Sequence, residues 1–114
     1  MELTEIERND GISQVALAGK LDIAGLHEVD VLFHGLTAAK QQPAIVDLSG
    51  VDYIASLGMG MLISCAQSLQ RRGAKMALYG AHGVVDEALR SAAIDQVIPM
   101  VDTADAALAV VRAD

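Results

Sequence analysis

The residue whose type and position most strongly suggest chemistry is Ser56. It lies between an almost uniformly apolar run at 44–48 and a helical apolar pattern that begins near Leu57. A serine at a helix start can act as N-cap, which stabilises the helix by about 1 kcal/mol. The same hydroxyl can carry a phosphate, because free N–H groups and the helix dipole favour negative charge there. The two roles are compatible, so we predict Ser56 as a cap and keep it as a phosphorylation candidate.

Asp22 is a second polar side chain at a candidate helix start. It stands in the sequence Gly-Lys-Leu-Asp-Ile at 19–23, directly before a segment with helical apolar spacing. Its carboxylate could serve only as the N-cap of that helix, since Asp is a preferred capping residue. It could instead present its charge to a partner. The sequence leaves both roles open.

Other groupings of polar residues do not predict a catalytic, metal or cofactor site. His27, Asp30 and His34 share one helical face, but such a face beside an apolar stripe is usually ordinary surface. Gly58 and Gly60 resemble the start of a dinucleotide-binding loop that lacks its third glycine. The sequence contains no Walker lysine loop, nucleophile elbow or zinc-ligand spacing. We therefore expect no enzyme activity, no metal and no cofactor.

The composition limits the classes of partner and compartment. The chain has 114 residues, a net charge of −7 and a single cysteine, Cys65, which falls in an apolar helix pattern and is expected in the core. The negative charge disfavours nucleic acid as a partner. The longest apolar segment, 57–69, is too short to span a bilayer, so we expect no direct membrane insertion. The N-terminus lacks the features of a secretory signal, which predicts a cytoplasmic protein.

The N-terminal half predicts a hairpin followed by a helix. Strand-like segments at 3–7 and 12–18 flank Asn-Asp-Gly, a sequence that favours a tight turn. Apolar residues then recur at helical spacing between Gly25 and Lys40, and Pro43 ends that segment.

The next unit predicts a strand, a helix and another strand. The run at 44–48 is apolar on both faces, which indicates a central or parallel strand. A polar turn follows, and a wide apolar stripe at 58–69 predicts a helix that ends at Arg-Arg-Gly. The segment 75–79 is expected to form the strand after it.

The C-terminal part predicts two more helices with a short strand between them. We expect helices at 84–92 and at 104–111, the second capped by Thr103, and a strand at Val97–Ile98 closed by Pro99. The resulting order, β-β-α-β-α-β-α-β-α, predicts an α/β fold with a mixed, mostly parallel sheet of four to five strands and about four helices. One domain is expected over 1–114.

Three motifs resemble a known family. Gly-Lys-Leu-Asp at 19–22, Val-Asp-Leu-Ser-Gly-Val at 46–51 and Ile-Ala-Ser-Leu-Gly-Met-Gly-Met-Leu at 54–62 are similar to a STAS domain, and more narrowly to stand-alone bacterial anti-sigma-factor antagonists. The resemblance implies a protein that binds an anti-sigma factor which is also a serine kinase. Phosphorylation at the helix start cancels binding in that family, and a serine phosphatase restores it.

The chain departs from the family pattern where the phosphate is usually carried. The family has Asp-Ser-Ser/Thr-Gly and most often uses the residue before glycine, whereas this chain has Ala55, Ser56, Leu57 and Gly58. Either Ser56 is the acceptor or the protein binds its partner without a phosphate switch. We favour Ser56.

The resemblance also selects residues for a partner-binding surface, which we list as Asp22, Ser56, Leu57, Gly58 and Met59. Met59 is expected to be an exposed contact. The alternative function is a non-phosphorylated STAS accessory subunit of a membrane lipid-transport system, in which loss of the usual acceptor would be natural.

Overall fold

The computed structural model describes residues 1–113 and begins with a β-hairpin. Strand β1 (Glu2–Ile6) pairs antiparallel with β2 (Ser13–Leu21), which confirms the predicted hairpin. Gly11 lies in the connecting turn with φ of 78°, a conformation that glycine adopts without steric cost.

The sheet has five strands whose spatial order follows the sequence. All pairs after the hairpin are parallel, so the predicted mixed, mostly parallel α/β sheet is confirmed. The apolar run at 44–48 lies in a strand with parallel neighbours on both sides, as its lack of alternation predicted. The other strands are β3 (Ala44–Ile54), β4 (Met76–Tyr79) and β5 (Met100–Val101).

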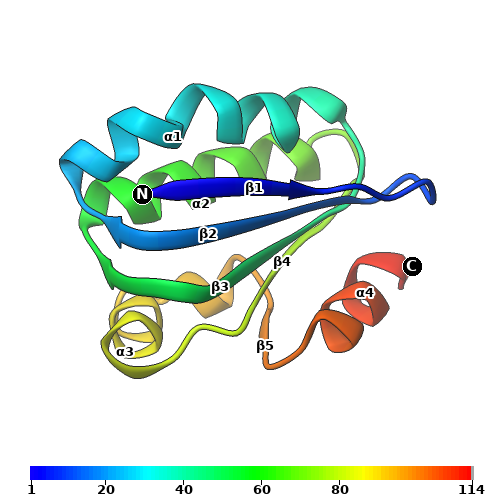
Figure 1. Cartoon of the computed structure of the whole chain (residues 1–114). Helices are drawn as coiled ribbons and strands as arrows, with labels where there is room; N and C mark the ends of the chain where they lie inside the picture. The colour runs from blue at the N-terminus through cyan, green and yellow to red at the C-terminus, as the bar shows by residue number, and fades with distance from the viewer. Residues whose placement is uncertain (114) are drawn as a thin grey trace.

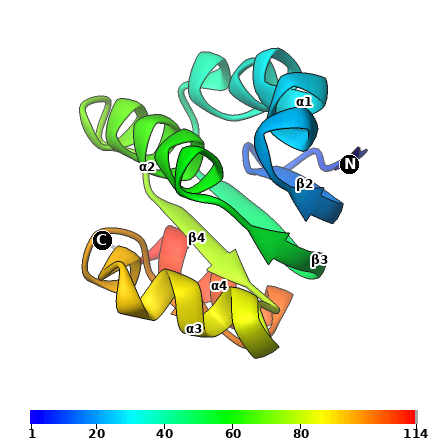
Figure 2. The same cartoon turned by 90° about the vertical axis from the view of Figure 1, so that its left-hand side faces the viewer.

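Helices cover both faces of the sheet. Helices α1 and α2 lie side by side on one face, and α4 covers the other (Figures 1 and 2). Helix α3 packs near β3, and its buried residues belong to the same core cluster as those of α1 and α2. The bounds are α1 (Ile23–Leu36), α2 (Ser56–Gln70), α3 (Gly83–Ser91) and α4 (Ala104–Arg112).

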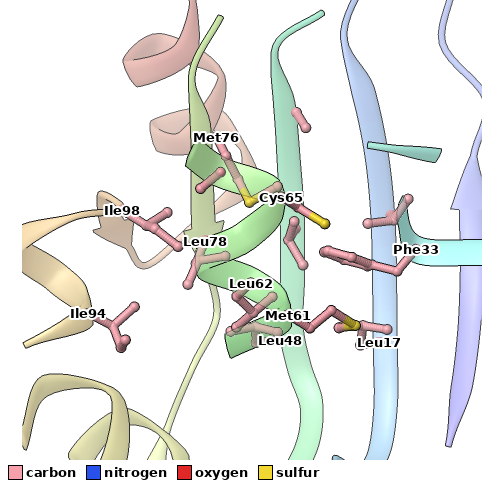
Figure 3. Packing of buried hydrophobic residues seen from close by; sticks show 14 of the residues in the cluster. Leu17, Phe33, Leu48, Met61, Leu62, Cys65, Met76, Leu78, Ile94 and Ile98 are labelled. Carbon is pink, nitrogen blue, oxygen red and sulfur yellow. The ribbon is translucent and has the colours of Figure 1, made fainter. Parts of the chain in front are cut away.

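The main core fills the space between α2 and the central strands. Met61 and Leu62 of α2 lie against the sheet, together with Phe33 from α1 (Figure 3). Cys65 is fully buried beside them, as predicted for a small core residue. The first turns of α1 and α2 lie close to the end of β2, where Gly25 approaches Lys20 and Gly58 approaches Leu21. A smaller cluster lies under α4 and consists of Ile12, Ile45, Ala77, Tyr79, Ala107 and Val111.

Strand β3 is longer than predicted. The polar segment expected to form a turn remains in the sheet, where Gly50 pairs with Ala18 and Ile54 pairs with Leu21. The pairing shifts register between Ala16 and Ala18, so the regular alternation of side chains is interrupted. A Cβ atom on Gly50 would lie 2.8 Å from the Ala18 Cβ atom, which explains glycine at this close approach.

The strand predicted at Val97–Ile98 is wrong. A 3-10 helix occupies Ile94–Gln96, and Ile98 is a fully buried core residue in the connection after it. The strand follows Pro99 instead, at Met100–Val101. The apolar character of this segment comes from core packing, which periodicity alone does not distinguish from a short buried strand.

Candidate functional site

Helix α2 starts one residue earlier than predicted, so Ser56 is not its N-cap. Ala55 holds the N-cap position with extended φ and ψ of −96° and 166°, and its methyl group cannot accept a hydrogen bond. The Ala55 N–H donates to the Leu21 carbonyl at 3.0 Å. Because this bond continues the pairing of β3 with β2, the helical backbone begins at Ser56.

The Ser56 side chain is exposed at the first helical position. Within residues 1–113 its hydroxyl makes no hydrogen bond that would hold it against the protein. The first N–H groups of any α-helix lack intrahelical acceptors, and here the Ala55 side chain supplies none. The first turn of α2 therefore presents a free hydroxyl together with N–H groups available to an outside acceptor.

The next residues of α2 differ in exposure. Leu57 is 56% exposed. It is an apolar residue at the position where the family pattern has the hydroxyl that accepts the phosphate. Gly58 is buried, and a Cβ atom there would lie 2.7 Å from Cγ of Leu21. Met59 is half-buried and packs against the core, so it is less exposed than predicted, and its role as a partner contact stays a prediction. Gly58 thus allows close packing of the helix on β2, while Leu57 faces outward.

Asp22 is the N-cap of α1, which confirms one of its two predicted roles. Its Oδ1 accepts the Gly25 N–H at 2.8 Å, and its carbonyl oxygen accepts the Leu26 N–H at 2.8 Å. The residue as a whole is only partly buried, so part of it stays exposed beside the cap. Capping consequently leaves Asp22 able to contact a partner.

The structure brings the starts of α1 and α2 to one edge of the sheet. The bond between Leu21 and Ala55 joins them, and large apolar side chains nearby are exposed: Ile23 by 58% and Tyr53 by 48%. We define the strand-end surface as Asp22, Ile23, Tyr53, Ser56 and Leu57. Ile23 and Tyr53 were not predicted from the sequence. Ile23 is the first residue of α1, and Tyr53 lies two residues before the N-cap of α2, so an apolar side chain near each helix start was the available signal.

A surface pocket of about 510 Å³ lies at the same edge. Its lining contains two carboxylates, one ammonium group and one phenol ring, from Asp22, Asp52, Lys20 and Tyr53. Lys20 and Tyr53 are paired across β2 and β3. A second hollow of about 580 Å³, next to the β1–β2 turn, is lined by polar side chains alone and contains none of the predicted site residues.

The histidines of α1 do not form a metal site. Nδ1 of His34 lies 3.3 Å from the Cys65 sulfur, and Nε2 of the same ring lies 3.2 Å from Oδ1 of Asp30. Within residues 1–113, no three His, Cys, Asp or Glu side chains are arranged to hold a metal ion. Burial raises the pKa of the Cys65 thiol to about 11, so at neutral pH this thiol is protonated and a poor nucleophile.

A family model for the STAS domain matches residues 4–107, and the chain belongs to the STAS family. No curated protein matches the sequence significantly. Among residues 1–113, no helix has the length and apolar character needed to cross a membrane.

Solved structures with the same fold include anti-sigma factor antagonists and a sulfate transporter family protein. An anti-sigma factor antagonist from Mycobacterium paratuberculosis is 24% identical, with a TM-score of 0.84 and coverage of 98% of this chain and 96% of that chain. The Bacillus cell fate determinant SpoIIAA in its phosphorylated form is 15% identical, with a TM-score of 0.67 and coverage of 97% and 100%. A sulfate transporter family protein from Wolinella succinogenes is 20% identical, with a TM-score of 0.73 and coverage of 91% and 87%.

Proposed function

We propose that this protein is an anti-sigma-factor antagonist that binds its partner through the strand-end surface. The observation that carries the proposal is the exposure of Ile23, Tyr53 and Leu57 around two helix starts. Exposed aromatic and aliphatic side chains that gather at one place are typical of a protein-binding surface. The partner is an anti-sigma factor with serine kinase activity, and its capture releases a sigma factor in the cytoplasm.

Ser56 is the phosphate acceptor in this proposal. Its exposed hydroxyl is accessible to a kinase, and the open first turn of α2 offers N–H groups to a phosphate. A phosphate adds up to about −2 of charge beside Leu57 and makes the apolar surface costly to bury. Phosphorylation therefore releases the anti-sigma factor, and a serine phosphatase restores binding.

The phosphorylation step is tested by incubating the protein with candidate serine-kinase anti-sigma factors and ATP, followed by mass spectrometry. We expect one phosphate on Ser56 and none on the Ser56→Ala variant. Ser64→Ala is the matched control, because Ser64 is exposed on the same helix but away from its start. Equal phosphorylation of Ser56→Ala, or none on the wild type, would remove the phosphate switch from the proposal.

A second candidate function is a non-phosphorylated accessory subunit of a membrane lipid-transport system. It is favoured by Leu57, an exposed apolar side chain where the family pattern carries the acceptor. Such a residue suits permanent association better than a switch. Co-purification from native cells separates the two functions: a kinase and a sigma factor support the first, whereas a permease with its ATPase supports the second.

The proposed function requires no catalytic step by this chain itself. Within residues 1–113 the Ser56 hydroxyl has no hydrogen-bonded histidine or carboxylate that could act as its base. The buried Cys65 thiol is kept protonated by its raised pKa. The reaction that modifies the protein is performed by its partner.

A further inference from the structure

We propose that the outer side of β1 is a second interaction surface, on which an extended basic segment of another protein adds a strand to the sheet. We call residues 2–7, with their outward-pointing backbone groups, the β1 edge. It contains no residue of the strand-end surface, so the inference goes beyond the proposed function and does not depend on it.

The backbone of the β1 edge is open. Strand β1 lies at one end of the strand order, and within residues 1–113 no strand pairs with its outer side (Figure 1). In β2 the Ser13 N–H donates to the Pro43 carbonyl, toward β3, so the even-numbered residues of β2 bond to the even-numbered residues opposite them in β1. The N–H and C=O groups of Leu3 and Glu5 therefore point outward, as a template for another strand.

The charge of the β1 edge selects a basic strand over a second copy of this chain. Glu2, Glu5 and Glu7 are exposed, and residues 1–7 contain no lysine or arginine. Pairing with the same edge of another copy would bring together three carboxylates from each chain, in molecules of net charge −7. Like charges on paired strands destabilise the pairing, whereas lysine or arginine opposite a glutamate favours it.

A hollow of about 580 Å³ lies at the end of the β1 edge and is lined by Glu5, Glu7, Arg8 and Asn9. The Arg8 guanidinium donates to the Asp10 carboxylate, which offsets its charge. Two carboxylates of the lining are thus left for a cation from outside. A long basic side chain of the added strand can enter this hollow while its backbone pairs with β1.

Apolar side chains flank both faces of the β1 edge. Leu3 packs on the main core under α1, so the even-numbered Ile6, which is 38% exposed, lies on the opposite face. On α1, Glu28 contacts the Met1 amino group, and Leu32, one turn further along the same side, is 52% exposed. The added strand should alternate: basic residues whose methylene stems cover Leu32, and apolar residues that cover Ile6.

The test is a titration of the full chain with acetyl-Lys-Val-Lys-Val-Lys-amide, followed by amide chemical shifts. We expect shifts at residues 2–7 and slower solvent exchange of the Leu3 and Glu5 amides. Binding should weaken several-fold when the salt concentration rises from about 50 mM to about 300 mM. The scrambled peptide acetyl-Lys-Lys-Val-Val-Lys-amide and the acidic peptide acetyl-Glu-Val-Glu-Val-Glu-amide should bind at least about fivefold more weakly.

Variants separate the backbone from the charge. Glu5→Pro removes an outward N–H at a position where an edge strand tolerates proline, so it should abolish binding. Glu5→Gln removes the same charge but keeps the N–H, so it should weaken binding by only about two- to threefold. Glu87→Gln, on the exposed side of α3, is the matched control. The double variant Glu5→Lys, Glu7→Lys, which does not require proline in the strand, should prefer the acidic peptide.

Shifts confined to other regions, equal binding of the patterned and scrambled peptides, or an unchanged preference in the double lysine variant would overturn the inference. A dimer of this chain that Glu5→Pro dissociates would also overturn it, because the edge would then pair with a second copy. None of these results bears on whether an anti-sigma factor binds the strand-end surface.

Discussion

At the scale of single residues, the two helix starts of the strand-end surface differ in one respect. Asp22 caps α1 with its own side chain, whereas Ala55 leaves the first turn of α2 without a side-chain acceptor. Helix α2 therefore lacks a stabilising contact that most helix starts have. The open turn is the feature that makes Ser56 suited to carry a phosphate.

A capping residue introduced at position 55 should stabilise the protein. Ala55 already has the extended backbone of an N-cap, so Ala55→Asp should raise the free energy of unfolding by about 1 kcal/mol. Urea denaturation measures the change. Ala55→Asn should give a similar gain without the added charge, and a loss of stability in both variants would contradict the assigned helix start.

At the scale of elements, the start of α2 depends on close packing against the end of β2. Gly58 is buried against Leu21, and its Cβ atom would lie 2.7 Å from Leu21 Cγ, whereas Gly60 on the same helix has open space. The two glycines therefore have opposite expected responses to the same substitution.

Gly58→Ala should lower the free energy of unfolding by about 1 to 3 kcal/mol, because the added methyl group displaces a fully buried leucine. Gly60→Ala should raise it by about 0.5 to 1 kcal/mol, since alanine has the higher helix propensity and meets no atom within 4 Å. Chemical denaturation of the pair checks both values. A stabilising Gly58→Ala would show that α2 does not pack on β2 as described.

Most elements were predictable from local patterns. The hairpin turn with Gly11, the apolar central strand and the caps Asp22 and Thr103 follow from residue type and spacing, and the structure confirms them. Apart from the strand expected at Val97–Ile98, the main failure concerns long-range pairing. Strand β3 extends to Ile54 only because β2 runs beside it with a shifted register, and that pairing has no local signature.

The candidate site was predictable only in part. The motif around Ser56 placed the candidate site where α1 and α2 begin, but the wrong helix start followed from the missed extension of β3. Lys20 and Asp52 could not be associated by sequence, since their strands are joined by the whole of α1. The pocket they share with Tyr53 is a property of the folded sheet.

At the scale of the whole molecule, a polar network ties the N-terminal hairpin to the C-terminal helix. The Asp10 carboxylate accepts hydrogen bonds from Arg8 and, at 2.9 Å, from Arg112 of α4. Arg8 also donates to Gln14 at 3.0 Å, and Gln14 donates to the Tyr79 hydroxyl at 2.9 Å. The network therefore joins the connection between β1 and β2 to β2, β4 and α4, outside the strand-end surface.

This network predicts a loss of stability at acidic pH. The hydrogen bond from Arg8 lowers the pKa of Asp10 from 3.8 to about 2, so the unfolded chain binds the proton more readily than the folded one. The contribution of Asp10 is present above pH 4 and disappears as pH falls toward 2. At pH 6 the Asp10→Asn variant should have a lower midpoint temperature of thermal unfolding than the wild type. The two midpoint temperatures should become nearly equal near pH 2. Asp102→Asn is the control, because it removes a carboxylate that forms no ion pair among residues 1–113. Its difference in midpoint temperature from the wild type should not change between pH 6 and pH 2.

Calorimetric titration with the cognate anti-sigma factor measures whether the strand-end surface binds this partner, as we propose. Leu57→Asp should weaken binding by at least about tenfold, because it places a charge in the apolar centre of the contact. Val31→Asp is the matched control, since Val31 is 86% exposed on α1 outside this surface, and its affinity should equal that of the wild type. An unchanged affinity for Leu57→Asp, or an equal loss for Val31→Asp, would contradict the account.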